Sequence, residues 1–457
     1  MKTIKTDVCV VGAGAGGFGC VYRLLKNGIN TVVVEKNKDF GGTAVFCGVD
    51  GWEPGVSLDG AHLLLKEKLQ KMNQGAAVLE AVPNCNLFFP ENGMNWENHS
   101  FEQYPWGLSM PSNFHYSDTL KRCRSLRKDG SMKRFQFEGA AMTKAMHQVL
   151  APYQNKLSAL FGYEFYACEK SGRNIRSVTV KNGGESIRIV ADFYIDATGD
   201  IILSREAGCA VAMGSESKYR YQEPSAGEKD SRQMNAVTYV FRVSPAANPN
   251  HIDEMPVRYQ KVDISAWKAY KMKRTVSCFC LYPNHDINVN MLPTMEGAEY
   301  IDFGEAADEV GKARVYSYWK YLQTEKNMNG YSLTKIFSAG VRESYRLIGK
   351  YVLNENDVRA GLFSQPKRGR TVAIADHALD VHGTSGMCRE LEYPYEIPLE
   401  CTMPREVDNL FVASRGASFS HIAAASARLT RTILSLGEGV GEYVAEQINS
   451  GLYFKNV

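Results

Sequence analysis

Two histidines in the last part of the sequence have neighbours that suit proton transfer, the reaction to which imidazole is best adapted near neutral pH. His421 and Arg428 are seven residues apart, which places both on nearly one face of a helix. There His421 would transfer a proton and Arg428 would hold an anionic or carbonyl group. The alternative is a histidine that caps the helix together with a structural arginine. His382 follows Asp380 by two residues and is a second candidate, because the carboxylate or a backbone acceptor would orient its ring.

A group of three charged residues precedes these histidines. Arg342 and Arg346 have the spacing of one helical turn, and Glu343 lies between them. Such a group is more often an ion-pair network between domains than a clamp for a bound molecule. Both interpretations stay open for Arg342, which joins His421, Arg428 and His382 as a candidate catalytic residue.

The N-terminal segment has the residue types that bind phosphate groups. An apolar run over residues 7–11 breaks at Gly12, Gly14 and Gly17 and then resumes as a helix. In this pattern the first glycine permits a tight turn, the second lets the backbone approach a pyrophosphate, and the third lets helix and strand pack closely. The new helix also presents free N–H groups and a partial positive charge. We therefore predict a dinucleotide site that includes the intervening Ala15 and Gly16.

A second strand, Thr31 to Val34, ends in Glu35. The offset from the glycines is about the ~20 residues at which a carboxylate meets ribose hydroxyls. Glu35, with Lys36 beside it, is therefore a predicted ribose ligand. A glycine-rich structural turn is the alternative, but it does not explain the whole series of strand, glycines, helix, strand and acid.

Three further segments identify the dinucleotide by resemblance. Phe40-Gly-Gly-Thr43 follows the acid as it does in FAD-binding flavoproteins with two dinucleotide-binding folds, and unlike simple NAD dehydrogenases. That resemblance implies two distant cofactor segments, and the sequence has both, at 193–200 and 408–416. The cofactor residues it adds are Gly41, Gly42, Thr43, Ala197, Thr198, Gly199, Asp200 and Arg415.

Over nearly its whole length the chain resembles the FAD-dependent oxidoreductase family, which is distantly related to fumarate reductases and ketosteroid dehydrogenases. The most specific segments are 41–55, 340–353, 380–383 with 395–398, and 420–428. The resemblance implies FAD as cofactor, and it implies that helix amides near Ala423 lie beside N1 and O2 of the flavin. One departure is Ser414, where the family has glycine; serine there would change how closely the backbone approaches the flavin.

The segments predict an α/β fold: an FAD-binding Rossmann-like domain of the glutathione reductase type with an inserted β-rich α+β substrate domain. Residues 1–215 would form the first part of the FAD domain, with an aromatic insertion at 56–135. Residues 216–330 would form the substrate domain, and 331–457 would return to the FAD domain and end in one helix over about 423–449. Within these parts we expect a helix over 138–150, strands at 176–180, 186–190, 236–243, 275–282 and 286–291, and a helix over 306–324.

Composition narrows the class of protein. With 457 residues, 44% hydrophobic and 23% charged, the chain is typical of a globular protein with two or three domains. A net charge of +3 is too small to favour nucleic acid or a membrane as partner. The 11 cysteines form no C-x-x-C pair, so we expect no metal site and no disulfide framework. The sequence shows neither a signal peptide nor an apolar run of about 18 residues, which predicts a cytoplasmic protein.

We expect hydride transfer between flavin N5 and a small polar organic substrate, with the direction open. The paired cysteines of disulfide reductases are absent: Ala44 and Val49 occupy their positions, and Cys47 is out of register. The glycines at 437–441 lie within a helical pattern, so no second dinucleotide site for a nicotinamide is evident. Electrons would therefore pass between the substrate and a transient acceptor or partner protein. The alternatives are a monooxygenase or halogenase-like enzyme, or a non-catalytic electron-transfer or RNA-modification component that docks through the basic cluster at 121–134.

Overall fold

The computed structural model describes residues 1–52, 60–72, 77–78, 135–272, 275–282, 284–366, 369–383, 386–389, 391 and 393–451. Most of the predicted aromatic insertion, 56–135, and the whole basic cluster at 121–134 lie outside these residues. The expectations attached to them stay untested.

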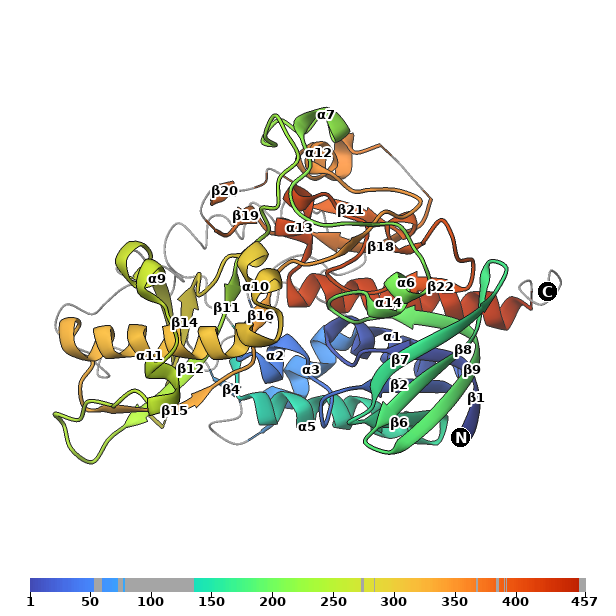
Figure 1. Ribbon diagram of the computed structural model, residues 1–457. Helices are drawn as coiled ribbons and strands as arrows, with labels where there is room; N and C mark the ends of the chain where they lie inside the picture. The colour runs from blue at the N-terminus through green and yellow to red at the C-terminus, as the bar shows by residue number, and fades with distance from the viewer. Residues whose placement is uncertain are drawn as a thin grey trace.

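A mainly parallel sheet forms the first layer (Figure 1). Its centre is β1 (Lys2–Val11), which pairs in parallel with β2 (Thr31–Glu35) and β9 (Glu185–Asp196). β6 (Leu157–Phe161) extends the sheet beyond β2, and β22 (Leu410–Val412) pairs in parallel with the end of β9. The central strands are apolar because both of their faces are covered. Their carboxyl ends meet at one edge, where ligands bind in open α/β sheets.

The far half of this sheet is an antiparallel hairpin. β7 (Glu164–Ser171) pairs with β8 (Asn174–Asn182), and β8 pairs with the first half of β9. The strands predicted at 176–180 and 186–190 are confirmed as parts of β8 and β9, and this antiparallel pair leads directly into the Asp196 strand end.

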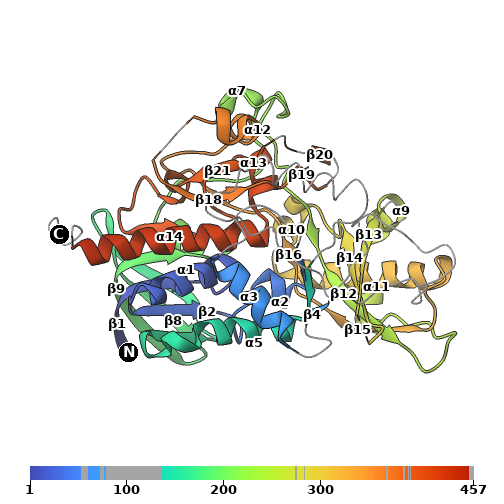
Figure 2. The ribbon, with the colours of Figure 1, turned by 180° about the vertical axis from the view of Figure 1, so that it is seen from behind.

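Two helices cross the parallel sheet side by side (Figures 1 and 2): α1 (Ala15–Lys26) and α14 (Thr430–Ser450). Glycines permit this close approach. A Cβ on Gly437 would lie 2.0 Å from the carbonyl oxygen of Gly16, and one on Gly441 would lie 2.8 Å from that of Cys20. The glycines at 437–441 therefore serve helix packing, which confirms that they are not a second dinucleotide motif.

A second lobe has its own antiparallel sheet and its own core (Figure 1). The sheet order is β13 (Val276–Leu281), β14 (Ile287–Leu292), β12 (Val240–Pro245) and β15 (Tyr331–Ile336), and α11 (Ala307–Glu325) packs against it. The strands predicted at 275–282 and 286–291 and the helix predicted at 306–324 are confirmed to within a few residues, but the strand predicted at 236–243 is divided into β11 (Val237–Thr238), which pairs with β16 (Gly340–Val341) in a separate sheet, and β12. β15 lies beyond the predicted boundary at 330, so this sheet takes one strand from the segment expected to return to the FAD domain.

The predicted single C-terminal helix is wrong. The structure has α13 (His421–Ala427) and then α14, with Leu429 between them in an extended conformation at φ −60° and ψ 143°. The break makes the start of α14 a separate helix N-terminus.

The remaining elements are short or connect these layers. They are α2 (Thr43–Phe46), β3 (Gly51–Trp52), α3 (Gly60–Gln70), β4 (Ala77–Val78), β5 (Phe135–Phe137), α5 (Gly139–Leu150), α6 (Ile202–Glu206), β10 (Val211–Ala212), α7 (Lys218–Tyr221), β11 (Val237–Thr238), α8 (Val257–Gln260), α9 (Ser265–Tyr270), α10 (Gly297–Phe303), β16 (Gly340–Val341), β17 (Arg346–Leu347), α12 (Glu355–Ser364), β18 (Thr371–Ala375), β19 (Leu379–Val381), β20 (Met387–Arg389) and β21 (Tyr395–Pro398). Among the described helices, none combines the length and the apolar character needed to cross a bilayer.

Candidate functional site

A cavity of about 840 Å³ opens where the parallel strands end, and residues of the second lobe complete its wall. Most of the predicted cofactor residues line it: Gly12, Gly14, Ala15, Gly16, Glu35, Lys36, Gly42, Thr43, Ala197, Thr198, Gly199, Asp200 and Arg415. Gly17, Gly41 and Ala423 do not line it. The volume is at the upper end of the usual range for cofactor pockets.

Each of the three glycines in the first loop occupies its position for a different structural reason. Gly12 has φ +102°, and a Cβ there would lie 2.8 Å from the backbone of Ala197. A Cβ on Gly17 would lie 1.9 Å from the Gly12 carbonyl oxygen, so Gly17 serves packing as predicted. A Cβ on Gly14 would meet only the Cα of Gly42, at 3.7 Å. Gly14 and Gly42 thus face each other with bare backbone along the cavity wall.

The Glu35 carboxylate is fixed at the end of β2 by the neighbouring backbone. Its Oε2 accepts a hydrogen bond from the Ala13 N–H at 2.8 Å, and its Oε1 accepts from the backbone and side chain of Asn37 at 2.9 and 2.6 Å. The side chain is buried but lines the cavity. This arrangement connects the glycine loop to the predicted ribose position.

Asp200 and Arg415 form an ion pair on the cavity wall. Asp200 Oδ1 accepts from Arg415 Nη2 at 3.0 Å and from the Ser344 hydroxyl at 2.6 Å. Burial opposes ionisation of Asp200, but Arg415 and Ser344 outweigh it and hold the pKa of this carboxyl below its usual range. A Cβ on Gly199 would lie 1.9 Å from Arg415 Nη1, so the glycine also makes room for this guanidinium.

A second group of charged side chains lines the same cavity: Arg342, Asp380, His382 and Arg428. His382 Nε2 lies 2.7 Å from Asp380 Oδ2, and Arg428 Nη2 lies 3.8 Å from the same oxygen. Arg342 Nη1 donates to the Ala236 carbonyl at 2.9 Å and to the Thr238 hydroxyl at 2.6 Å. The structure therefore brings together three of the four predicted catalytic residues.

The protonation states of this group follow from burial and charge. Burial and the nearby Arg342 lower the pKa of His382 to about 4, although Asp380 acts in the opposite direction. Burial opposes ionisation of Asp380, yet the hydrogen bond from His382 and the charge of Arg428 hold its pKa below the usual range. At neutral pH His382 is thus a neutral imidazole whose Nε2–H points to a carboxylate, which leaves the Nδ1 lone pair available. Burial and Arg428 lower the pKa of Arg342 to about 9, so it remains cationic.

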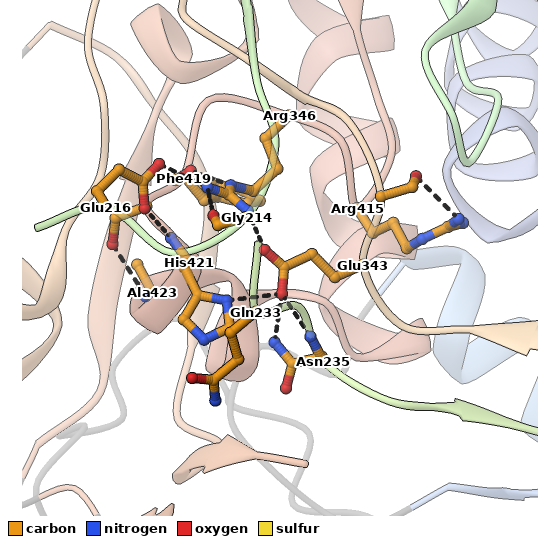
Figure 3. A network of polar contacts seen from close by, with 12 residues as sticks. Gly214, Glu216, Gln233, Asn235, Glu343, Arg346, Arg415, Phe419, His421 and Ala423 are labelled. Atoms are coloured by element: carbon orange, nitrogen blue, oxygen red, sulfur yellow. Dashed lines mark hydrogen bonds and ion pairs between the residues drawn. The ribbon is translucent and has the colours of Figure 1, made fainter. Parts of the chain in front are cut away.

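His421, by contrast, does not line the cavity. Its Nδ1 lies 2.8 Å from Glu343 Oε2, and Glu216 Oε2 accepts from its backbone N–H at 2.9 Å (Figure 3). Arg346 bridges Glu343 and Glu216, and all four side chains are at most 5% exposed. The predicted pairing of His421 with Arg428 is therefore not formed, because the face of α13 that carries His421 packs into this network. Arg346 and Glu343 form the predicted ion-pair network, whereas Arg342 reaches the cavity.

The helix start near the cavity is that of α14 and not that of α13. The Ser420 hydroxyl accepts from the Ala423 N–H at 3.1 Å, so the protein itself caps α13. Leu429, Thr430 and Arg431 line the cavity instead, at the N-terminus of a 21-residue helix. The positive end of the helix dipole thus faces the cavity. Local sequence signals do not predict this break, because residues 423–449 contain no proline and their pattern is that of one helix.

Arg431 and Cys47 also line the cavity. Arg431 is buried and pairs with Asp376 at 2.6 Å; neither residue was predicted in the site. Cys47 lines the cavity and its Sγ donates to the Ala339 carbonyl at 3.2 Å. Burial raises the pKa of this thiol to about 11, which disfavours the thiolate at neutral pH.

A family model described as FAD dependent oxidoreductase matches residues 7–457. The chain belongs to this family. FAD is accordingly its cofactor, and the residues fit it: the bare backbones of Gly14 and Gly42 would accommodate the pyrophosphate, Glu35 would accept from a ribose hydroxyl, and the N-terminus of α14 on the same cavity would favour negative charge on the flavin.

Curated relatives match this family member only over short segments. A 3-oxosteroid 1-dehydrogenase of Rhodococcus opacus is 38% identical over 12% of this chain and 11% of its own length. A phytoene desaturase of Fusarium fujikuroi is 33% identical over 20% of this chain and 17% of its own length. A 4-oxocyclohex-2-ene-1-carboxylate 5-dehydrogenase of Sinomonas cyclohexanicum is 41% identical over 12% of this chain and 9% of its own length. The chain thus matches less than a fifth of each of these relatives.

Solved structures are similar over most of the chain. A geranylgeranyl bacteriochlorophyll reductase-like protein of Thermoplasma acidophilum has a TM-score of 0.47 at 13% identity, covering 99% of this chain and 80% of the other. The L-proline dehydrogenase of P. horikoshii has a TM-score of 0.42 at 12% identity, covering 99% and 95%.

We expect Glu35→Ala to weaken FAD binding by about 1–3 kcal/mol, the usual contribution of a hydrogen bond to a charged group. Activity at saturating FAD should be retained, because Glu35 lies at the ribose end. Titration of FAD-depleted protein, followed by quenching of flavin fluorescence, measures the affinity. Glu35→Gln is the matched control, since it keeps one oxygen for the Ala13 N–H. Unchanged affinity in Glu35→Ala would show that no ribose hydroxyl meets this carboxylate.

We also expect the free energy of unfolding to fall as the pH decreases from about 6.5 to 4. Burial and the charge of Arg346 lower the pKa of His421 to about 4, so in this window the unfolded chain binds a proton that the folded chain does not. The loss attributable to His421 is on the order of 2–3 kcal/mol. Urea unfolding of wild type and His421→Gln across this range measures it. The pH dependence should be shallower in the variant, and identical slopes would contradict the lowered pKa.

Proposed function

We propose that this FAD-dependent oxidoreductase transfers a hydride between flavin N5 and a small polar organic substrate bound beside Arg342, His382 and Arg428. The observation that carries the proposal is that one cavity holds both the glycine loops for FAD and this charged group. A dinucleotide site alone would account for the first set of residues and not for the second.

When bound, FAD supplies the hydride chemistry. The chain's own residues hold the substrate and move its proton. His382 is neutral at pH 7, so its Nδ1 can take a proton from a substrate hydroxyl or carbon, and the resulting cation is stabilised by Asp380. In the reverse direction the same imidazolium returns the proton.

Arg342 and Arg428 orient the substrate in this proposal. Arg342 is held by the Ala236 carbonyl and the Thr238 hydroxyl, and Arg428 by the Asp380 carbonyl at 3.3 Å. Two anchored guanidinium groups next to one imidazole suit a carbonyl or an anionic substituent. The positive end of α14 favours negative charge that develops nearby.

The direction of the reaction is part of the test. The curated relatives are named as dehydrogenases and a desaturase, which supports oxidation of the substrate, although the matched segments are short. The reverse direction, reduction of an activated double bond, uses the same residues. The electrons would pass to or from a transient acceptor or a partner protein.

The experiment is anaerobic titration of the FAD-bound protein with a panel of small alcohols, amines, hydroxy acids and saturated ketones. Loss of the flavin absorption band identifies a substrate of dehydrogenation. Reoxidation of chemically reduced protein by unsaturated ketones or acids identifies the reverse reaction. If no compound does either, the proposal is wrong. Oxygen-dependent hydroxylation with NADH or NADPH would instead show a monooxygenase.

A further inference from the structure

Asn235 lies directly behind the charged group, completely buried, and does not line the cavity. Its side-chain Oδ1 accepts from the His382 backbone N–H at 3.0 Å. Its Nδ2 and its backbone N–H both donate to Glu343 Oε2, at 2.7 and 2.8 Å. One amide side chain therefore joins the His382 backbone to a buried carboxylate.

That carboxylate is itself firmly held. Glu343 Oε1 accepts from Arg346 Nη1, and Oε2 also pairs with His421 Nδ1 (Figure 3). Because this carboxylate pairs with the Arg346 guanidinium, its oxygens act as acceptors and require the NH₂ end of the Asn235 amide to face them. The oxygen end must then face His382, so the orientation of the amide is determined by charge.

The next residue holds the other side of the charged group. The Ala236 N–H donates to the His382 carbonyl at 3.0 Å, and the Ala236 carbonyl accepts from Arg342 Nη1 at 2.9 Å. Asn235 and Ala236 thus bind both the N–H and the carbonyl of His382, and Ala236 also binds the guanidinium of Arg342.

We propose that Asn235 is a positioning residue, which uses the buried Glu343–Arg346–His421 network to hold His382 against Asp380 and in line with Arg342. None of the three network members lines the cavity. The network would therefore act on the site through Asn235, in addition to stabilising the fold. The inference rests on the proposed role of His382. No proton passes along this route, because a carboxamide does not relay one to a backbone N–H; the effect is geometric.

The test measures the pKa of His382 directly in the FAD-bound protein, by NMR titration of carbon-13-labelled histidine rings. The His382 signal is assigned from its absence in His382→Gln. In Asn235→Ala the backbone anchor is lost and the ring moves away from Asp380, whose hydrogen bond raises the pKa of His382, so this pKa should fall further below its ordinary value by on the order of one unit. Flavin content and the unfolding midpoint are recorded in parallel.

Asn409→Ala is the matched control. Asn409 is also a buried asparagine that joins separate segments, accepting from the Ile175 N–H at 2.9 Å and donating to the Ile175 and Asp192 carbonyls at 2.9 and 3.0 Å. It does not line the cavity, so its loss should lower stability without moving the His382 titration. A His382 pKa that is the same in wild type and Asn235→Ala, or that shifts equally in both asparagine variants, would overturn the inference.

Kinetics with a substrate from the panel separates this inference from the proposed function. Asn235→Ala should slow flavin reduction by about 10²-fold, as expected for a displaced catalytic group. In a His382→Gln background the same substitution should have no further effect, because Asn235 acts through His382. Additive losses would overturn the inference alone. A wild-type rate in His382→Gln would overturn the role of His382, even if the NMR shift is found.

Discussion

Gly14→Glu is expected to give a folded protein without FAD. A Cβ at this position meets only the Cα of Gly42, at 3.7 Å, so the fold tolerates a side chain there. The carboxylate would then extend into the cavity at the expected position of the pyrophosphate. An unpaired buried charge costs on the order of 3–5 kcal/mol, which corresponds to a loss of affinity of about 10²–10⁴-fold. The ratio of flavin absorbance to protein absorbance, together with circular dichroism, measures both outcomes.

Two glycine variants serve as controls. Gly14→Ala adds bulk without charge and should reduce FAD affinity less than Gly14→Glu. Gly17→Ala should instead impair folding, because its Cβ would lie 1.9 Å from the Gly12 carbonyl oxygen. Full flavin occupancy in folded Gly14→Glu would mean that the first glycine loop does not contact the cofactor.

His382→Gln is expected to retain FAD and to slow substrate-linked flavin reduction by about 10²–10⁴-fold, the usual contribution of a general acid or base. Glutamine preserves a donor to Asp380 but takes up no proton. In the wild type the neutral imidazole is the active base, and burial and Arg342 lower its pKa to about 4. The rate should therefore fall only as the pH drops through about 4, and this acid limb should be missing in the variant. Anaerobic stopped-flow measurements across the pH range give both results.

His147→Gln is the matched control for this prediction. His147 also pairs with a carboxylate, Asp39, at 2.6 Å, but its side chain is 46% exposed at the surface. It should react like the wild type at every pH. If His382→Gln keeps the wild-type rate and the fall in rate near pH 4, then His382 is not the base that acts beside Arg342 and Arg428.

The sequence by itself determined the FAD-binding half of the site. The order of strand, glycines, helix, strand and Glu35 is encoded in contiguous residues, and parallel strands place their carboxyl ends at one edge. Distant segments such as 196–200 could be placed because each is also a strand end, which the pairing of β9 with β1 brings to the same edge. For these residues the local sequence pattern is sufficient to predict the position in the tertiary structure.

Only the tertiary structure decided which of the two predicted histidines, His382 or His421, faces the cavity. The spacing of His421 and Arg428 predicts that both lie on one helical face, but it does not predict what that face packs against. The structure buries His421 against Glu343 and Glu216, and the extended Leu429 ends α13 directly after Arg428. His382 reaches the cavity because Asn235, 147 residues earlier in the sequence, anchors its backbone. Such contacts depend on long-range packing and on the satisfaction of buried charges, which no local spacing encodes.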